Sequence, residues 1–269
     1  MRKRAGCDVA KSDLSIDRIL TETFVSTVDH RDQIESTNDL GLAMVTGGQP
    51  ILPALVLAEQ QTAGRGRGAN RWWSAAGALT FSVVFEAASF QIPSQLLPQI
   101  SLATGLAVCE TLRKELPGQR ACLKWPNDIY LEGRKVCGIL VETSRPSAPF
   151  VVVGVGINVN NSLQRAPAEL RTIATSLVDV AGRPCDRTSL LIGALQQLEL
   201  QLRRFRTHRI EFLDRWRELC LLQGRTVCLE VGDRQFIGVC QSIDNEGALL
   251  LQCETGIQRF LAGVVRRIL

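Results

Sequence analysis

The sequence predicts an α+β protein, with one mixed β-sheet and its helices followed by a small second β-domain. Apolar runs of strand length recur at 54–59, 78–86 and 150–160. Short hairpin turns join several strand segments, and this favours a mixed sheet over a doubly wound parallel one. After Gly224 the pattern changes to short strands that alternate with turns, which predicts a separate β-domain.

The N-terminal third of the chain predicts two short helices. The first follows a basic tail and spans 12–24, with Ser12 as its N-cap. Ser36 or Thr37 caps the second, because a hydroxyl there can accept a hydrogen bond from the first helical turn. The glycine pair at 47–48 ends this helix.

Longer elements are predicted in the middle of the chain. Residues 95–116 form a long, mostly buried helix that a Pro-Gly pair closes. Two strands, CLKWPNDIYL and VCGILVETS, are joined by a tight turn at the Glu-Gly pair 132–133. Residues 186–222 carry helical periodicity that starts near the cap Thr188 or Ser189. Strands and helices therefore belong to one large domain.

The C-terminal β-domain is predicted to pack on the large domain, because a unit of about 45 residues buries too little surface to be stable alone. The predicted division is 1–33 for the N-terminal tail and short helix, 34–222 for the large domain and 223–269 for the small one.

Composition excludes several classes of protein. The chain has 269 residues and is 45% hydrophobic, so it can bury a sizeable core; its net charge of +4 is too small to indicate nucleic-acid binding. Nine cysteines without a C-x-x-C pair, and only two histidines, argue against a zinc site and for reduced thiols. With no secretory signal and no apolar run of membrane-spanning length, the predicted location is cytoplasmic.

The segment GRGRGANRWW, residues 64–73, is the first candidate binding site. Its glycines let a ligand approach the backbone, and exposed N–H groups in such loops can bind anions. Arg65 and Arg67 supply planar charged groups suited to phosphate or carboxylate, and Trp72 offers a flat face. The alternative is an ordinary arginine–glycine surface loop, or one that contacts RNA. The spacing matches neither a Walker loop nor the dinucleotide fingerprint.

The segment KWPND is the second candidate. Its proline stiffens a turn that presents Asn127 and Asp128 at a fixed place. Lys124 could neutralise a phosphate, and Asp128 could bind Mg²⁺ or act as a base. The alternative is an ordinary Pro-Asn-Asp turn.

Three further segments carry weaker signals. The small polar side chains of STN, residues 36–38, could recognise a polar ligand head or simply cap a helix. Lys135 enters an apolar strand in which Gly138 permits close backbone approach, or it is a hairpin lysine at the strand edge. The glycines of GVGIN also permit close approach, and Asn158 at its end could bind a nucleotide or satisfy a turn.

The order of these segments closely resembles that of biotin–protein ligases, from about Ile34 to the C-terminus. GRGR together with KWPND and K-x-x-G-I-L-V-E is highly specific to that family. The resemblance implies that ATP adenylates biotin to biotinyl-5′-AMP, and that biotin then passes to one lysine of a biotin carboxyl carrier domain, commonly in acetyl-CoA carboxylase. It also implies a catalytic domain like that of class II aminoacyl-tRNA synthetases, followed by an SH3-like β-barrel.

The resemblance also implies roles for individual residues. The expected biotin contacts are Ser36, Thr37, Asn38, Gln61, Arg65, Gly66, Arg67, Lys135, Gly138 and Leu140. The expected ATP contacts are Arg65, Arg67, Trp72, Lys124, Asn127, Asp128 and Asn158, with Mg²⁺ near Asp128. The expected catalytic side chains are Lys135, Arg67, Lys124 and Asp128, the last also as an aid to deprotonation of the carrier lysine.

Some features depart from the family pattern. The stretch before STN is too short for the N-terminal DNA-binding domain of bifunctional relatives, so a ligase without DNA-binding activity is expected. Ala69 and Asn70 stand where some relatives have Gly and Arg, although Arg71 supplies a basic group one place later. A homodimer is an open expectation, because the relatives' main sheet can pair across a dimer. The alternatives are a lipoate-type ligase, a non-catalytic biotin or biotinyl-AMP sensor and an RNA binder.

Overall fold

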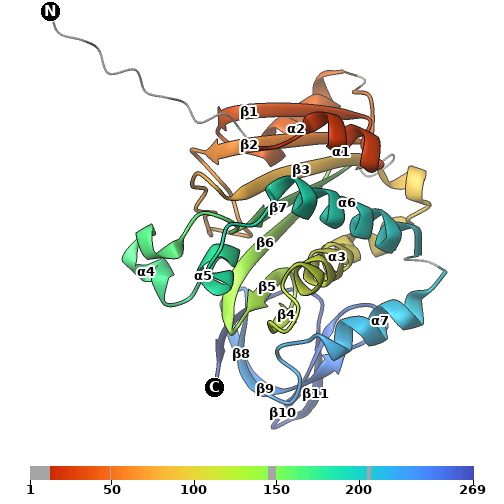
Figure 1. Ribbon diagram of the computed structural model, residues 1–269. Coiled ribbons are helices and arrows are strands. Elements are labelled where there is room, and N and C mark those ends of the chain that lie inside the picture. The colour runs from red at the N-terminus through yellow and green to blue at the C-terminus, as the bar shows by residue number, and fades with distance from the viewer. Residues whose placement is uncertain (1–12, 49, 145–149, 205–206) are drawn as a thin grey trace, which may run out of the picture.

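The structure is a computed structural model that describes residues 13–48, 50–144, 150–204 and 207–269. A seven-stranded sheet forms its centre (Figure 1). In spatial order its strands are β1 (Thr27–Ile34), β2 (Ala54–Gln61), β3 (Leu79–Glu86), β7 (Phe150–Ile157), β6 (Arg134–Thr143), β5 (Asp128–Leu131) and β4 (Ala121–Lys124). Strands β1 and β2 are parallel and the other neighbours are antiparallel, so the predicted mixed sheet is confirmed.

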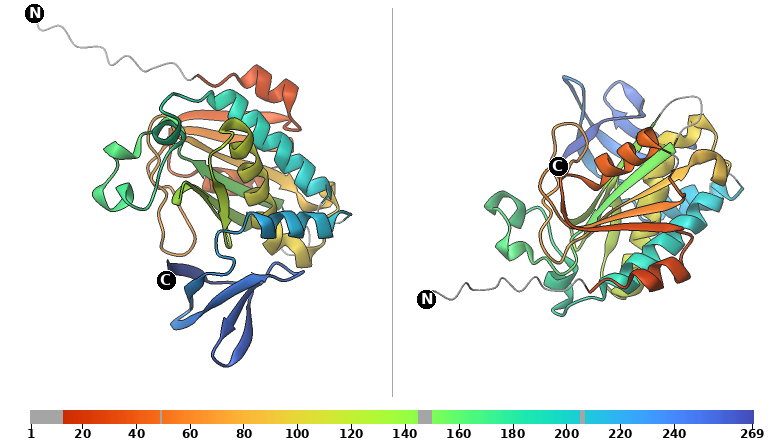
Figure 2. Two further views of the ribbon diagram at one scale, coloured as in Figure 1. Left: turned by 60° about the horizontal axis from the view of Figure 1, so that its bottom comes forward. Right: turned by 90° about the horizontal axis from the view of Figure 1, so that it is seen from above.

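Helices cover both faces of this sheet. The α-helices are α1 (Ile16–Glu22), α2 (Thr37–Gly47), α3 (Ile100–Glu115), α4 (Ala168–Arg171), α5 (Leu177–Ala181), α6 (Arg187–Arg204) and α7 (Arg209–Glu218). The 3₁₀ segments are η1 (Ala87–Phe90), η2 (Ser94–Gln99) and η3 (Leu163–Arg165). Helices α1, α3 and α6 lie on one face, and α2 lies alone on the other (Figure 2, right).

The alternation of side chains along β7 separates two cores. Val151, Val153 and Val155 face the main core beneath α3 and α6. Val152, one residue out of phase, packs with Ala54 and Val84 beneath α2. Successive side chains of a strand point to opposite faces of the sheet. The even-numbered positions of β7 therefore face the α2 side.

Strand β1 is one of the elements that the sequence pattern missed, together with the short helices α4 and α5. Its sequence, TVDHRDQI, has polar residues at most positions and no buried side chain. It lies at the edge of the sheet and, within the described part of the chain, its one neighbouring strand is β2. An edge strand can carry polar residues on both faces, and this removes the alternation by which a strand is recognised. The predicted helix 95–116 also differs at its start, which is the 3₁₀ segment η2 containing Pro98.

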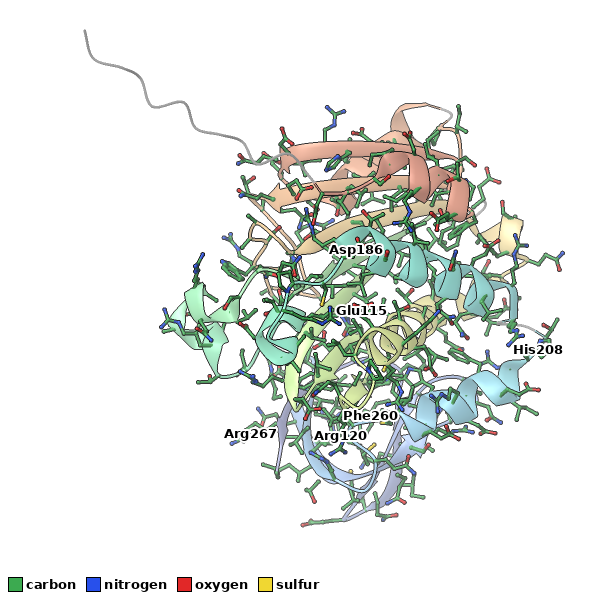
Figure 3. All side chains as sticks on the ribbon, in the orientation of Figure 1. Glu115, Arg120, Asp186, His208, Phe260 and Arg267 are labelled. Carbon is green, nitrogen blue, oxygen red and sulfur yellow. The ribbon has the colours of Figure 1, made fainter. Side chains whose placement is uncertain are left out.

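Helix caps also correct parts of the prediction. Helix α1 begins after Ser15, while the predicted cap Ser12 lies outside the described residues. The predicted span 186–222 holds two helices, α6 and α7. Asp186 lies at the start of α6 (Figure 3). It is the cap of this helix, because its carboxylate accepts hydrogen bonds from the backbone N–H groups of Thr188 and Ser189. Thr188 and Ser189, the two caps that the sequence predicted, therefore donate these hydrogen bonds and do not cap the helix. At α2 the predicted cap Ser36 is confirmed, since its side chain accepts from Asp39 N.

The small C-terminal domain is a five-stranded antiparallel sheet. In spatial order its strands are β11 (Gly256–Phe260), β10 (Leu249–Cys253), β9 (Arg234–Ile243), β8 (Thr226–Val231) and β12 (Val264–Ile268). It lies below α7 and the β4 end of the large sheet (Figure 2, left). Most of its buried apolar residues belong to the main core cluster, which they share with residues of the large sheet. Trp125 Nε1 donates to the carbonyl oxygen of Gly247 at 3.1 Å, so the domains also share a buried hydrogen bond.

Each described cysteine is a free thiol. Among the described helices, none combines the length and the apolar character needed to span a lipid bilayer.

Candidate active site

One pocket of about 880 Å³, counting the space at its open mouth, lies on the α2 face of the large sheet. Its lining combines segments that are far apart in the sequence: the start of α2, the Gly/Arg loop (residues 64–72), the β4–β5 turn, β6, β7 and β12. Of the residues predicted for the site, those that line it are Ser36, Thr37, Asn38, Gln61, Arg65, Gly66, Arg67, Trp72, Lys124, Asn127, Asp128, Lys135, Gly138 and Leu140. The structure therefore brings all but one of them together.

Asn158 is the exception, because it lies outside this lining. Its side chain is buried at the end of β7, where Nδ2 donates to the carbonyl oxygen of Thr175 at 3.0 Å. Its Oδ1 accepts from Asn161 Nδ2 at 2.9 Å. The amide thus joins β7 to the segment before α5. Of the two roles considered from the sequence, nucleotide binding and hydrogen bonding within a turn, these contacts match the second.

The start of α2 forms a closely hydrogen-bonded end of the pocket. Ser36, Thr37 and Asn38 are all buried. Ser82 Oγ, on β3, lies 2.8 Å from Thr37 Oγ1 and 2.6 Å from Asn38 Oδ1. The backbone N–H of Thr37 donates to Gln61 Oε1 at 2.7 Å. Buried polar groups need such partners, and this end of the pocket presents amide and hydroxyl groups held in fixed positions.

Two glycines of β7 form the floor of the pocket. Gly154 pairs with Leu140 and Gly156 pairs with Gly138 across β6 and β7. A Cβ atom on Gly154 would lie 2.0 Å from Asn38 Oδ1, and one on Gly156 would lie 2.3 Å from the indole ring of Trp72. No side chain fits at either position, so glycine is required for Asn38 and Trp72 to lie against the sheet.

The Gly/Arg loop is a short hairpin over the pocket. The backbone N–H of Gly66 donates to the Asn70 carbonyl at 2.8 Å, and that of Trp72 donates to the Gly64 carbonyl at 2.9 Å. Its two arginines point to different partners. Arg65 forms ion pairs with Asp39 and Glu142, whereas Arg67 donates from Nη1 to the Gly263 carbonyl at 3.2 Å.

The β4–β5 turn and β6 form the cationic end of the pocket. Lys124 pairs with Asp128 across β4 and β5, and Asp128 pairs with Gly138 across β5 and β6. Lys135 Nζ lies 2.7 Å from Asp128 Oδ1. Lys124 Nζ donates to Tyr130 Oη at 3.2 Å. The lining holds five cationic side chains and one carboxylate, so positive charge is in excess.

Burial changes the pKa values of two cations at this end of the pocket. Burial lowers the pKa of Lys124, while Asp128 raises it and Lys135 lowers it further. Burial likewise lowers the pKa of Arg67, against an opposing effect of Asp128. Both shifts mean that the protonated cations lack full solvation or pairing. An anionic ligand would supply the missing charge, so the electrostatics favour a phosphate or carboxylate here.

Trp72 presents a donor to the same space. Its indole Nε1 is buried and has no hydrogen-bond partner among the described residues. A buried N–H without a partner costs free energy and is uncommon, so an acceptor atom of a ligand would relieve it.

The sequence of the chain matches known families in both domains. Residues 31–160 match the Biotin/lipoate A/B protein ligase family, and residues 223–266 match the Biotin protein ligase C terminal domain. The Biotin–[acetyl-CoA-carboxylase] ligase of Mycobacterium tuberculosis is 35% identical over 222 residues, which cover 81% of this chain and 80% of that protein. The chain belongs to the biotin–protein ligase family.

Other members of the biotin–protein ligase family agree with this. The Biotin–[acetyl-CoA-carboxylase] ligase of Paracoccus denitrificans is 30% identical over 233 residues, which cover 83% of this chain and 93% of that protein. The solved structure of the biotin protein ligase from Aquifex aeolicus in complex with biotin and ATP superposes with a TM-score of 0.77. It is 30% identical, and the match covers 90% of this chain and 99% of that one.

Some lining residues of this biotin–protein ligase family member were not predicted. For Gly154 and Gly156 a signal was present, since glycines inside an apolar strand indicate close approach of another group. Val264 and Val265 of β12 also line the pocket. Two valines in a β-strand carry no signal of their own, because only the packing of the small domain brings them to the site.

Proposed function

We propose that this protein is an ATP-dependent biotin–protein ligase. It forms biotinyl-5′-AMP and pyrophosphate from biotin and ATP, and then transfers biotin to a lysine of a biotin carboxyl carrier domain. The main support is the composition of the pocket on the α2 face of the large sheet. Its Ser36–Asn38 end suits an uncharged polar head, and the adjacent Lys124–Lys135 end suits anions.

The first step joins two anions, and the pocket offsets their repulsion. An oxygen of the biotin carboxylate attacks the α-phosphorus of ATP, the bond to the β-phosphate oxygen breaks, and pyrophosphate leaves with the electron pair. Arg67, Lys124 and Lys135 line the pocket where this charge would develop. Positioned cations in a partly desolvated site stabilise such a transition state and require little reorganisation.

Asp128 fits the role of a Mg²⁺ ligand. Its carboxylate lines the pocket at the cationic end. Among the described residues there is no cluster of three or more His, Cys, Asp or Glu side chains that could hold a metal. Mg²⁺ at nucleotide sites is commonly bound by one or two carboxylates together with substrate phosphates, and this lining matches that pattern. When bound, the ion supplies neutralisation of phosphate charge.

The second step needs an unprotonated amine. The carrier lysine attacks the carbonyl carbon of biotinyl-5′-AMP, AMP leaves, and the amine loses a proton. Asp128 is the candidate to receive that proton, because it is the carboxylate of the lining. The partner is a biotin carboxyl carrier domain, in keeping with the names of the relatives. A cytoplasmic location, a homodimer, the absence of DNA binding and the division at residues 34–222 and 223–269 stay predictions.

Intact-mass analysis of an apo carrier domain tests the proposal. The carrier is incubated with the protein, biotin, ATP and Mg²⁺, and in parallel with lipoate in place of biotin. A mass gain of one biotinyl group, absent in the lipoate arm, is the expected result. Pyrophosphate release without a mass gain would mean that the carrier is wrong and the adenylation right. Loss of both signals would contradict a ligase and leave a biotin sensor.

A further inference from the structure

The two arginines of the Gly/Arg loop hold it from opposite sides. Arg67 reaches the small domain at the Gly263 carbonyl. Arg65 reaches the large domain, where Nη1 and Nη2 donate to the two carboxylate oxygens of Glu142 at 3.0 and 2.7 Å. Its Nη2 also pairs with Asp39. The sequence predicted that Arg65 would bind ligand, but its guanidinium is held by two carboxylates in this structure.

Glu142 connects this loop to the polar end of the pocket. It lies on β6, two residues beyond Leu140, and its Oε2 also accepts from Asn38 Nδ2 at 2.8 Å. The same amide donates to the carbonyl oxygen of Leu140 at 3.2 Å. One carboxylate oxygen thus contacts both Asn38, at the polar end of the pocket, and Arg65, in the loop over the pocket.

We propose that Glu142 is a positioning residue that holds the Gly/Arg loop over the pocket through Arg65, and that it thereby sets how long biotinyl-5′-AMP stays bound. This inference rests on the proposed function. Glu142 is not among the residues that line the pocket, so its effect on the ligand passes through Arg65 and Asn38.

The strength of the contact follows from its geometry. A two-point contact between a guanidinium and a carboxylate is stronger and more directional than a single one. The side chain of Glu142 is 25% exposed, so solvent screens the pair less than a fully exposed one. Asp39 is 50% exposed and contacts one nitrogen, so it is the weaker of the two anchors.

Release of labelled adenylate tests the proposal. Wild-type protein and Glu142→Gln are loaded with biotin and labelled ATP, separated from free nucleotide, and chased with unlabelled biotin. Glu199→Gln is the matched control, because Glu199 pairs with Arg203 at the same 2.7 Å and is 27% exposed, but lies on α6 away from the pocket.

The expected result is release on the order of tenfold faster from Glu142→Gln, the size of one charge-assisted hydrogen bond, with Glu199→Gln unchanged. The maximal rate of pyrophosphate release should stay near wild type while the KM for biotin rises. The double variant Arg65→Gln/Glu142→Gln should release the adenylate no faster than Arg65→Gln alone, because each substitution removes the same contact between Arg65 and Glu142. A purely structural role would give additive effects and a parallel loss of kcat.

Trypsin cleavage of the ligand-free protein supplies a second readout. Cleavage after the loop arginines should be faster in Glu142→Gln than in Glu199→Gln. If Glu142→Gln fails to fold, Asp39→Asn carries the same test with a smaller effect. If Glu142→Gln released the adenylate and was cleaved by trypsin at the same rates as the wild type, the role given to Glu142 would be wrong, while the proposed function would stand. Absence of pyrophosphate in the wild type would overturn the proposed function instead, and the cleavage assay would still decide the role of Glu142.

Discussion

The two ends of the pocket are built from opposite kinds of polar group. At the α2 end, Thr37 and Asn38 are neutral, buried and bonded to Ser82. At the other end, Lys135 forms an ion pair with Asp128, Lys124 donates to Tyr130 Oη, and burial lowers the pKa of Lys124. One end therefore holds hydrogen-bond donors and acceptors in fixed positions for a neutral group, while the other keeps an excess of positive charge for an anion.

Removal of Lys135, at the cationic end, should give the largest effect on catalysis. Lys135→Ala should lower kcat for pyrophosphate release by about 10²–10³-fold, the usual cost of one group that stabilises developing charge. It also leaves Asp128 without its 2.7 Å partner. Lys114→Ala, in the last turn of α3, is the control. A loss confined to the KM for biotin would mean that Lys135 binds substrate only.

Gly154→Ala tests the neutral end. The added Cβ would lie 2.0 Å from Asn38 Oδ1, so Asn38 must move and its contacts with Ser82 and Leu140 are disrupted. The KM for biotin should rise on the order of tenfold or more, in line with one or two lost hydrogen bonds, while the KM for ATP changes little. Gly47→Ala is the matched control, because its Cβ would meet no atom. An equal rise in both KM values would show that the two ends do not act separately.

The pH dependence of adenylation should sharpen the assignment of Lys124. Because burial lowers its pKa, Lys124 loses its proton and charge at a lower pH than an exposed lysine does. The rate of pyrophosphate release should therefore fall on the alkaline side, beginning below the ordinary lysine pKa. Lys124→Arg keeps its charge, and its alkaline limb should move to higher pH. An unchanged limb in this variant would assign the titration to another group.

Ser82→Ala should have the smallest effect. The single hydroxyl hydrogen of Ser82 is donated to Asn38 Oδ1, and its oxygen accepts from the Thr37 hydroxyl, so the substitution leaves both buried groups without this partner, at a cost of about 1–2 kcal/mol in the free energy of unfolding. Thermal melting measures this loss, and the KM for biotin should rise only a few fold. Ser101→Ala, whose hydroxyl is exposed and bonds to Pro98 O, should leave both quantities unchanged.

Prediction from sequence succeeded where local chemistry dictates structure. The turn at Glu132 and Gly133 is confirmed, and both residues have positive φ, as a two-residue hairpin turn requires. It failed for β1, whose edge position removes the apolar alternation.

The site shows the same division. The motifs located most of the pocket lining. They did not show that Arg65 is bound by Glu142, or that β12 completes one wall, because such contacts depend on packing between residues far apart in the chain.

The contact between Arg67 and Gly263 joins residues 196 positions apart. A ribosome synthesises the Gly/Arg loop long before it reaches β12. During that interval the sheet and the loop can emerge, but the wall formed by Val264 and Val265 does not yet exist. A growing chain therefore acquires its complete pocket only after β12 has left the ribosome and docked, so nascent or prematurely terminated chains would carry an unfinished site.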